Sequence, residues 1–209
     1  MSNVRQTRVR MTGRERREQL LEIGRGVFAE KGYEAASIEE IAQRASVSKP
    51  VVYEHFGGKE GLYAVVVDRE VRSLLDRVTD ALDADHPRVK LEQAANAFLS
   101  YVQEEPGGFR ILLRDTPAVS GSGTFASLIG DIAAQVEYVL EEEFKERGFD
   151  VKLAPLYSRA LVGMIALVGQ WWLDAEKPSR DVVAAHLVNV AWNGLGHLDR
   201  SPSLRSSED

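Results

Sequence analysis

The chain has 209 residues, of which 44% are hydrophobic and 28% are charged, and it contains no cysteine. These proportions are ordinary for a soluble globular protein, and they exclude a disordered chain, a collagen and a low-complexity scaffold. The lack of cysteine excludes disulfide bridges, zinc sites with thiolate ligands and cysteine nucleophiles, and it is compatible with a reducing cytoplasm.

Positive charge is concentrated at the N-terminus. Residues 1–17 hold six arginines and one glutamate, whereas 23 acidic residues outnumber 15 basic ones after residue 60. On charge alone, the front of the chain is either a module that binds a polyanion or a solvated, disordered arm.

No membrane segment or secretory signal is expected. The longest apolar run, Ala160–Leu173, is interrupted only by Gln170 and is shorter than the roughly 20 residues that span a bilayer. The arginine-containing N-terminus has no apolar stretch of the kind found in secretory signals. The sequence therefore predicts a cytoplasmic protein without a membrane partner.

Apolar residues recur at helical spacing along the chain, while sustained apolar–polar alternation is absent. Capping boxes pair Thr12 with Glu15 and Ser37 with Glu40, and they mark two helix starts. The expected fold is all-α with about nine helices, and residues 115–123 are expected to form a loop. The predicted helices cover 13–31, 38–45, 49–55, 59–83, a segment from 87, a short segment around 109–112, 124–147, 155–174 and 180–197.

The predicted helices 38–45 and 49–55 are joined by a three-residue turn, which is the layout of a helix-turn-helix. In that arrangement the first helix crosses the DNA backbone and the second enters the major groove. The side chains expected to bury between the two helices are Ile41, Ala42, Val47 and Val52.

Polar side chains around these helices suit DNA. Ser37, Ser48 and Lys49 lie near predicted helix N-termini, where a phosphate group is favoured. Tyr53 and His55 can donate hydrogen bonds to phosphates or base edges, and a lysine at the start of the next helix can neutralise a phosphate.

Four motifs follow one another within residues 14–66. They are F-x-E-K-G-Y at Phe28–Tyr33, S-I-x-x-I-A at Ser37–Ala42, V-S-K-P-x-x-Y-x-H-F at Val47–Phe56 and K-E-x-L at Lys59–Leu62. In order and spacing this segment resembles the DNA-binding domain of TetR-type transcriptional regulators. The resemblance covers about a quarter of the chain, and the remainder is similar only in being all-helical and of the usual length.

The resemblance implies a role for each matching position. Ser48, Lys49 and Val51 would face the major groove, and Tyr33 would support the loop between the first two helices. The residues that would contact phosphates are Ser37, Tyr53, His55 and Lys59. The residues thus placed at the DNA are Ser37, Arg44, Ser48, Lys49, Pro50, Val51, Tyr53, His55 and Lys59.

Some positions depart from the family pattern. Ser46 stands where glycine is frequent, and a left-handed conformation there would cost about 1 kcal/mol of strain. Pro50 often is glycine, and Val51 often is threonine or alanine. Val51 can touch a thymine methyl group but cannot hydrogen-bond a base, and Glu54 is expected to face away from DNA. These departures concern the operator sequence rather than DNA binding itself.

The region after residue 66 carries no catalytic motif, and neither an enzyme activity nor a cofactor is expected. It has no glycine-rich phosphate loop and no nucleophile elbow. His186 and His197 are spaced to share a helix face, but no third ligand is evident, so no metal site is expected. The run Glu141–Glu143 is interpreted as a solvated helix face.

The last two predicted helices are unusually apolar. Such helices must be covered on all sides, either by the chain's own core or by a second copy. The resemblance implies a homodimer in which they form a four-helix bundle with the same helices of a second subunit. Small residues at Ala160, Gly163, Ala166 and Gly169 would let those helices approach closely.

The resemblance also implies a cavity for a small, largely apolar ligand, although aromatic residues at helical spacing are equally typical of an ordinary core. Gln170 and Asn193 are the polar residues considered as anchors. The candidate lining residues are Phe98, Tyr101, Phe109, Leu112, Phe125, Ile129, Met164, Gln170, Trp171 and Trp172.

The expected organisation is a disordered basic arm at 1–11, a DNA-binding domain at 12–58, a ligand-binding and dimerisation domain at 59–200, and a disordered tail at 201–209. The expected function is that of a repressor whose homodimer binds a near-palindromic operator in double-stranded DNA and is released by its ligand. A co-repressed regulator or an activator of the same fold remains the alternative.

Overall fold

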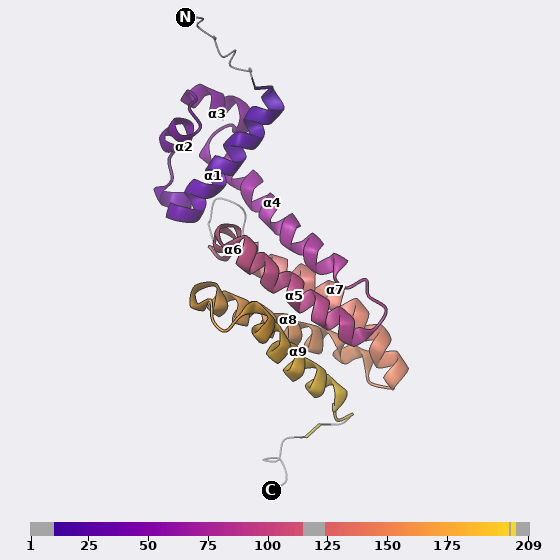
Figure 1. The fold of residues 1–209 in the computed structure, drawn as a ribbon. Coiled ribbons are helices and arrows are strands. Elements are labelled where there is room, and N and C mark those ends of the chain that lie inside the picture. The colour runs from indigo at the N-terminus through magenta and orange to yellow at the C-terminus, as the bar shows by residue number, and fades with distance from the viewer. Residues whose placement is uncertain (1–10, 115–123, 201, 204–209) are drawn as a thin grey trace, which may run out of the picture. The chain divides into compact units, whose positions relative to one another are not determined.

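The computed structural model describes residues 11–114, 124–200 and 202–203, and these residues contain nine α-helices, one turn of 3-10 helix and no strand (Figure 1). The predicted all-α fold is therefore confirmed. The predicted arm, internal loop and tail lie wholly or largely outside the described residues. The elements are α1 (Gly13–Ala35), α2 (Ile38–Arg44), α3 (Lys49–Phe56), α4 (Lys59–Asp80), α5 (Pro87–Glu104), α6 (Pro106–Leu113), α7 (Thr124–Arg147), η2 (Val151–Leu153), α8 (Ala154–Ala175) and α9 (Arg180–Gly196).

Most helix bounds agree with the sequence prediction to within a few residues. α7 has the predicted bounds, whereas α4 ends at Asp80 rather than at residue 83. α1 continues to Ala35 with a break at Gly32, whose φ of 78° and ψ of 171° are not helical. Glycine adopts this conformation without a steric penalty because it has no Cβ atom, and a short final turn follows it.

The described residues divide within α4 into an N-terminal unit, which ends at Arg69, and a C-terminal unit, which begins at Glu70. The sequence placed this boundary between residues 58 and 59. The first half of α4 belongs to the N-terminal unit because it packs on α1. Leu62 is 0% exposed, and a Cβ atom on Gly24 would lie 2.9 Å from its Cδ2 atom.

The N-terminal unit has a hydrophobic core formed by α1, α2, α3 and the start of α4. Phe28 of α1 is fully buried and makes an edge-to-face contact with Tyr63 of α4, with ring centroids 4.9 Å apart. Helices as short as α2 and α3 are not stable alone, so their packing on this core maintains them. Further buried members of the core are Leu20, Val27, Ile38, Ile41, Ala42, Val52 and Leu62.

In the C-terminal unit, α7 packs against α8, and α5 packs against α9. Phe109 of α6 lies among other aromatic rings, 5.7 Å from both Phe98 and Phe125 and 6.4 Å from Tyr101, measured between centroids. The Tyr101 hydroxyl donates a 2.6 Å hydrogen bond to Oε2 of Glu70, so a buried phenol and a buried carboxyl group are joined.

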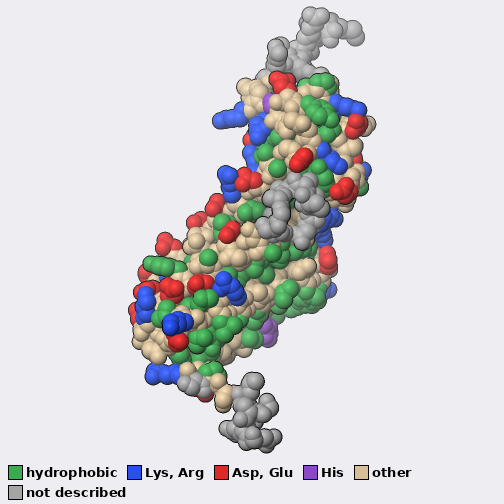
Figure 2. Space-filling view, turned by 180° about the vertical axis from the view of Figure 1, so that it is seen from behind, with side chains coloured by type: hydrophobic (Ala, Val, Ile, Leu, Met, Phe, Trp, Pro, Cys, Tyr) green, Lys and Arg blue, Asp and Glu red, His purple; other side chains and the backbone are tan. Residues whose placement is uncertain are grey.

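α8 carries apolar side chains on its exposed face as well as on the face that packs in the core of its unit. Among the described residues, the helical stretch Val151–Ala175 is long and apolar enough to cross a membrane, by length and composition only. This stretch is longer than the apolar run Ala160–Leu173 identified in the sequence, because it extends beyond that run at both ends. Leu156, Leu167 and Trp171 of α8 are 61%, 67% and 57% exposed. Figure 2 shows hydrophobic side chains gathered over part of the surface of the C-terminal unit.

Candidate nucleic-acid interface and apolar cavity

α2 and α3 are joined by a tight turn and a buried apolar contact. The turn is closed by a 2.9 Å hydrogen bond from the amide of Val47 to the carbonyl of Ala42. Ser46 is left-handed with φ of 55°, so the strain anticipated at this position is present. Ile41 and Val52, both 0% exposed, fix the two helices against the rest of the unit.

The first turns of α3 present an exposed surface. Lys49, Pro50 and Tyr53 are exposed, the last to 54%, while Val51 is half-buried. Ser48 is the N-cap residue of α3, but its side chain makes no capping hydrogen bond. The predicted groove-facing residues therefore lie together on one accessible end of a firmly packed helix.

The cations of this surface are bound to carboxylates of the same unit. Arg44 contacts Glu30 at 2.7 Å and Glu40 at 2.8 Å, and Lys49 forms an ion pair with Glu39. Hydrogen bonding to Arg44 lowers the pKa of Glu30, and hydrogen bonding to Lys49 lowers the pKa of Glu39. A phosphate that binds Arg44 or Lys49 therefore competes with a carboxylate for the same cation.

Two further cations hold backbone carbonyls. The Nη1 atom of Arg17 donates a 2.7 Å hydrogen bond to the carbonyl of His55 at the end of α3, and its guanidinium lies 4.3 Å from the ring centre of Phe56. Sequence reasoning missed this contact because no local pattern links residues 38 positions apart. Lys59, predicted beside a phosphate, is half-buried with its Nζ atom 3.0 Å from the carbonyl of Tyr33.

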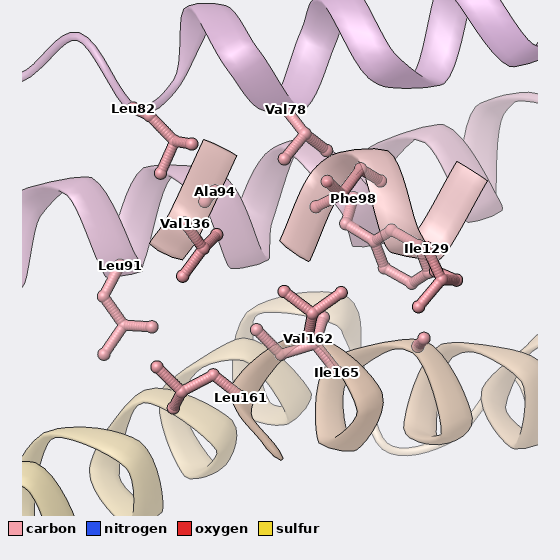
Figure 3. A pocket seen from close by; sticks show the side chains of 12 residues that line it. Val78, Leu82, Leu91, Ala94, Phe98, Ile129, Val136, Leu161, Val162 and Ile165 are labelled. Carbon is pink, nitrogen blue, oxygen red and sulfur yellow. The ribbon is translucent and has the colours of Figure 1, made fainter. Parts of the chain in front are cut away.

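An apolar cavity of about 60 Å³ lies inside the C-terminal unit, between α4, α5, α7 and α8 (Figure 3). All the residues that line it are hydrophobic. Phe98 of α5 and Ile129 of α7 are the two predicted ligand contacts that reach it. The remaining lining residues are Val78, Leu82, Leu91, Ala94, Ile132, Val136, Leu161, Val162, Ile165 and Ala166. Sequence reasoning missed these because aliphatic residues at helical spacing are the same in a cavity wall and in a core.

The other predicted ligand contacts do not line this cavity. Gln170 and Trp171 are exposed on α8, because the helix turns them away from the packed side that carries Ala166 and Trp172. The indole Nε1 of Trp172 donates a 2.8 Å hydrogen bond to the carbonyl of Pro178. The candidates that instead belong to or pack against the surrounding core are Tyr101, Phe109, Leu112, Phe125, Met164 and Trp172.

The polar anchors considered for a ligand are not brought to the cavity either. Asn193 is exposed on α9, where its Nδ2 atom donates a 2.9 Å hydrogen bond to Oδ1 of Asn189. Across residues 11–114, 124–200 and 202–203, no group of three or more histidine, aspartate or glutamate side chains is arranged to hold a metal ion.

Comparison with protein families accounts for both units. Residues 20–66 match the model of "Bacterial regulatory proteins, tetR family", and residues 77–205 match that of "Tetracyclin repressor-like, C-terminal domain". The chain belongs to the TetR family. This TetR-family protein is accordingly a DNA-binding transcriptional regulator with an N-terminal helix-turn-helix and a helical C-terminal domain.

Individual TetR-family relatives cover most of the chain. The "HTH-type transcriptional activator FasR" of Mycolicibacterium smegmatis is 32% identical over 186 residues, which are 88% of this chain and 84% of the relative. A TetR-like regulator from Rhodococcus sp. RHA1 is 26% identical, with a TM-score of 0.74 over 90% of this chain and 100% of that one. PfmR from Thermus thermophilus, also 26% identical, has a TM-score of 0.69 over 84% of this chain and 98% of its own.

Proposed function

We propose that this TetR-family protein works in the cytoplasm as a homodimer that reads a near-palindromic operator and responds to an apolar ligand. The observation that carries the proposal is the exposed end of α3, where Lys49 and Tyr53 are accessible on a helix held by the buried Val52. A groove-reading helix needs this combination, because its base contacts are specific only if the helix itself cannot shift.

The proposed DNA contacts begin at the N-termini of α2 and α3. The Oγ atom of Ser37 already accepts a 3.2 Å hydrogen bond from the amide of Glu40, which leaves its O–H free to donate to a phosphate. Lys49 and Tyr53 would meet base edges and backbone at the start of α3. The full set proposed at the DNA, with Lys59 considered apart, is Ser37, Arg44, Ser48, Lys49, Pro50, Val51, Tyr53 and His55.

The exposed apolar surface of α8 and α9 supports a homodimer through these helices. Leu167 of α8 and Val190 of α9 are 67% and 61% exposed, and exposed apolar patches mark interaction surfaces. A Cβ atom on Gly163 would meet nothing within 4 Å, so this face is open to a partner, whereas Gly169 is closed by Phe98. Two-fold pairing would also supply the two reading helices that a palindromic operator requires.

The size of the cavity supports a ligand that changes the protein's conformation. Drug-sized ligands occupy roughly 300–1,000 Å³, whereas this cavity measures about 60 Å³. A larger occupant would therefore bind better to a form in which α4, α5, α7 and α8 have moved apart. A ligand with such a preference shifts the population between the two forms and can thereby change the affinity for DNA.

The same architecture is compatible with two directions of regulation, repression and activation. In the first, the dimer represses transcription and the ligand releases it. In the second, the dimer activates transcription, and the name of the relative FasR, a transcriptional activator, favours this candidate. Measuring operator affinity with and without ligand, together with transcription from the operator-bearing promoter, separates the two.

The first experiment is selection of bound sequences from random duplex DNA by the purified protein. We expect one near-palindrome, bound about tenfold or more weakly by Lys49→Ala and Tyr53→Ala. Lys145→Ala is the matched control, because Lys145 is 55% exposed and paired with Glu142 much as Lys49 is 53% exposed and paired with Glu39. Recovery of no motif, or equal operator affinity of all three variants, would contradict the proposal.

A further inference from the structure

Lys59, the first residue of α4, has every donor of its ammonium group engaged within the N-terminal unit. Its Nζ atom lies 3.0 Å from the carbonyl oxygen of Tyr33, 3.2 Å from that of Ala36 and 3.4 Å from that of Glu34. A lysine ammonium has three N–H donors, so these three acceptors match its full capacity. Contact with a DNA phosphate would leave at least one carbonyl without this donor.

The three carbonyls belong to the C-terminal end of α1, where the last helical carbonyls lack partners within the helix and carry partial negative charge. α1 has no basic residue of its own in its last turn. The break at Gly32 directs the chain so that Tyr33, Glu34 and Ala36 offer their carbonyls to one point. Lys59 of α4 therefore places a positive charge at the C-terminal end of α1, where α1 has no basic residue of its own.

An aromatic contact fixes the same corner. The Nζ atom of Lys59 lies 4.3 Å from the centre of the Tyr33 ring, which is a favourable position for a cation. Tyr63, one helical turn further along α4, has its ring centroid 4.9 Å from those of both Tyr33 and Phe28. The ammonium group of Lys59 and the ring of Tyr63 thus both hold the start of α4 against Tyr33 at the end of α1.

The surroundings of this contact are unfavourable for a phosphate. Burial raises the pKa of Tyr33, and the carboxylates of Glu60 and Glu34 raise it further. Both carboxylates therefore act on Tyr33, whose ring packs against the ammonium group of Lys59. A phosphate at the ammonium group of Lys59 would add a negative charge beside the same ring, and like charges oppose each other.

We infer that Lys59 is a positioning residue that clamps the end of α1 and thereby sets the start of α2, rather than a ligand of DNA phosphate. Ala36, whose carbonyl it holds, directly precedes Ser37, the N-cap residue of α2. Lys59 thus acts on DNA through Ser37. The inference rests on the proposed function insofar as it takes Ser37 for a phosphate contact.

The salt dependence of operator binding distinguishes a clamp from a phosphate ligand. Removing one phosphate contact makes the slope of log affinity against log salt shallower by about 0.9. Lys59→Met should weaken operator binding about tenfold at fixed salt and leave this slope unchanged. Lys49→Met, the same substitution at a proposed DNA contact, should make the slope shallower. A shallower slope with Lys59→Met, or unchanged affinity, overturns the inference.

A double-mutant cycle tests the route through Ser37. If Lys59 only stabilised the unit, its removal and that of the Ser37 hydroxyl would weaken binding independently. As a positioning residue it should couple to Ser37, so that Ser37→Ala costs operator affinity in the wild type and little in Lys59→Met. Equal losses in both backgrounds would refute the positioning role.

The clamp can also be observed in the wild-type protein, so the inference stays testable if Lys59→Met does not fold. The ammonium ¹⁵N signal of Lys59 should be sharp, protected from exchange and unchanged by the selected operator, whereas that of Lys49 should shift. A shift at Lys59 on operator addition would overturn the inference. If the wild type binds no operator, the proposed function fails, while protection of this signal still decides whether the clamp exists.

Discussion

The two units of this protein present their functional side chains in opposite ways. In the N-terminal unit, the residues proposed to contact DNA are mostly polar and exposed, and the core beneath them is apolar and closed. In the C-terminal unit, the cavity, the core and the exposed face of α8 are all built from apolar side chains. A polar surface over an apolar core can be recognised from residue type, whereas three apolar environments cannot be told apart in this way. A substitution in the C-terminal unit therefore needs a control variant at another position of the same unit.

The largest effect is expected at the exposed face of α8. Leu167→Glu would place a charge in the proposed dimer contact twice, once from each copy, and should weaken dimerisation at least about 100-fold. Light scattering would report a monomer at micromolar concentration, and operator binding would be abolished with it. Tyr138→Glu is the control, because Tyr138 is 69% exposed and belongs to α7 rather than to either of the last two helices. A dimer that survives Leu167→Glu would remove this face from the interface.

The next effect concerns the wall of the cavity. A Cβ atom on Gly169 would lie 2.3 Å from Cε1 of Phe98, so Gly169→Ala must displace the ring that lines the cavity or separate α8 from α5. We expect a loss of about 1–3 kcal/mol in unfolding free energy. Gly130→Ala in α7 meets nothing within 4 Å and should gain up to about 1 kcal/mol by helix propensity. Denaturant unfolding checks both, and equal shifts in the two variants would contradict the close approach.

A smaller effect of opposite sign is expected in the turn between α2 and α3. Ser46→Gly relieves the left-handed strain at φ of 55° but increases the freedom of the unfolded chain. The net gain in unfolding free energy should be about 0.5 kcal/mol. Ser48→Gly, at φ of −83° and without a capping hydrogen bond, should bring a loss of similar size. Thermal unfolding of both variants would show whether their signs differ.

The smallest effect is a pH dependence of the N-terminal unit. In this unit, hydrogen-bond donors lower the pKa of each paired carboxyl group below its ordinary value of 4.5. The contribution of these carboxylates to stability is therefore present above pH 4.5 and is lost as the pH falls below that value. In the variant Glu30→Gln, unfolding free energy should decline less between pH 5 and pH 3 than in the wild type. An identical decline would show that the pair with Arg44 contributes no pH-dependent stability. The carboxylates concerned are Glu15, Glu18, Glu30, Glu39 and Glu40.

Local signals were sufficient for the helices and for the helix-turn-helix. Capping signals at Thr12 and Ser37, together with helical spacing, predicted element bounds that the structure reproduces closely, because such signals act within one or two turns. The full capping box forms at Thr12, whereas at Ser37 only the side chain of the serine caps the helix. Contacts between distant residues were not predictable in this way. The clamp of Lys59 on Tyr33 spans 26 positions, and a lysine at a helix start gives no indication of whether it will meet a carbonyl or a phosphate.

The same limit explains the cavity. Phe98 and Trp171 are both aromatic residues at helical spacing, yet Phe98 lines the cavity and Trp171 is 57% exposed on α8. The difference is set by the rotation of each helix about its axis, which depends on all the neighbours of that helix at once. Leu161 and Ile165 reach the cavity from the same helix as Trp171. Periodicity assigns such residues to a face, but it does not say whether a cavity, a core or a partner adjoins that face.

The apolar cavity also has a mechanical consequence. A space lined only by hydrophobic side chains offers a water molecule no hydrogen-bonding partner, so water fills it poorly. Space that water fills poorly disappears when the chain unfolds, and hydrostatic pressure favours the smaller volume, by an amount on the order of tens of mL/mol in proteins generally. A molecule that fills the cavity should therefore raise the pressure that the C-terminal unit withstands.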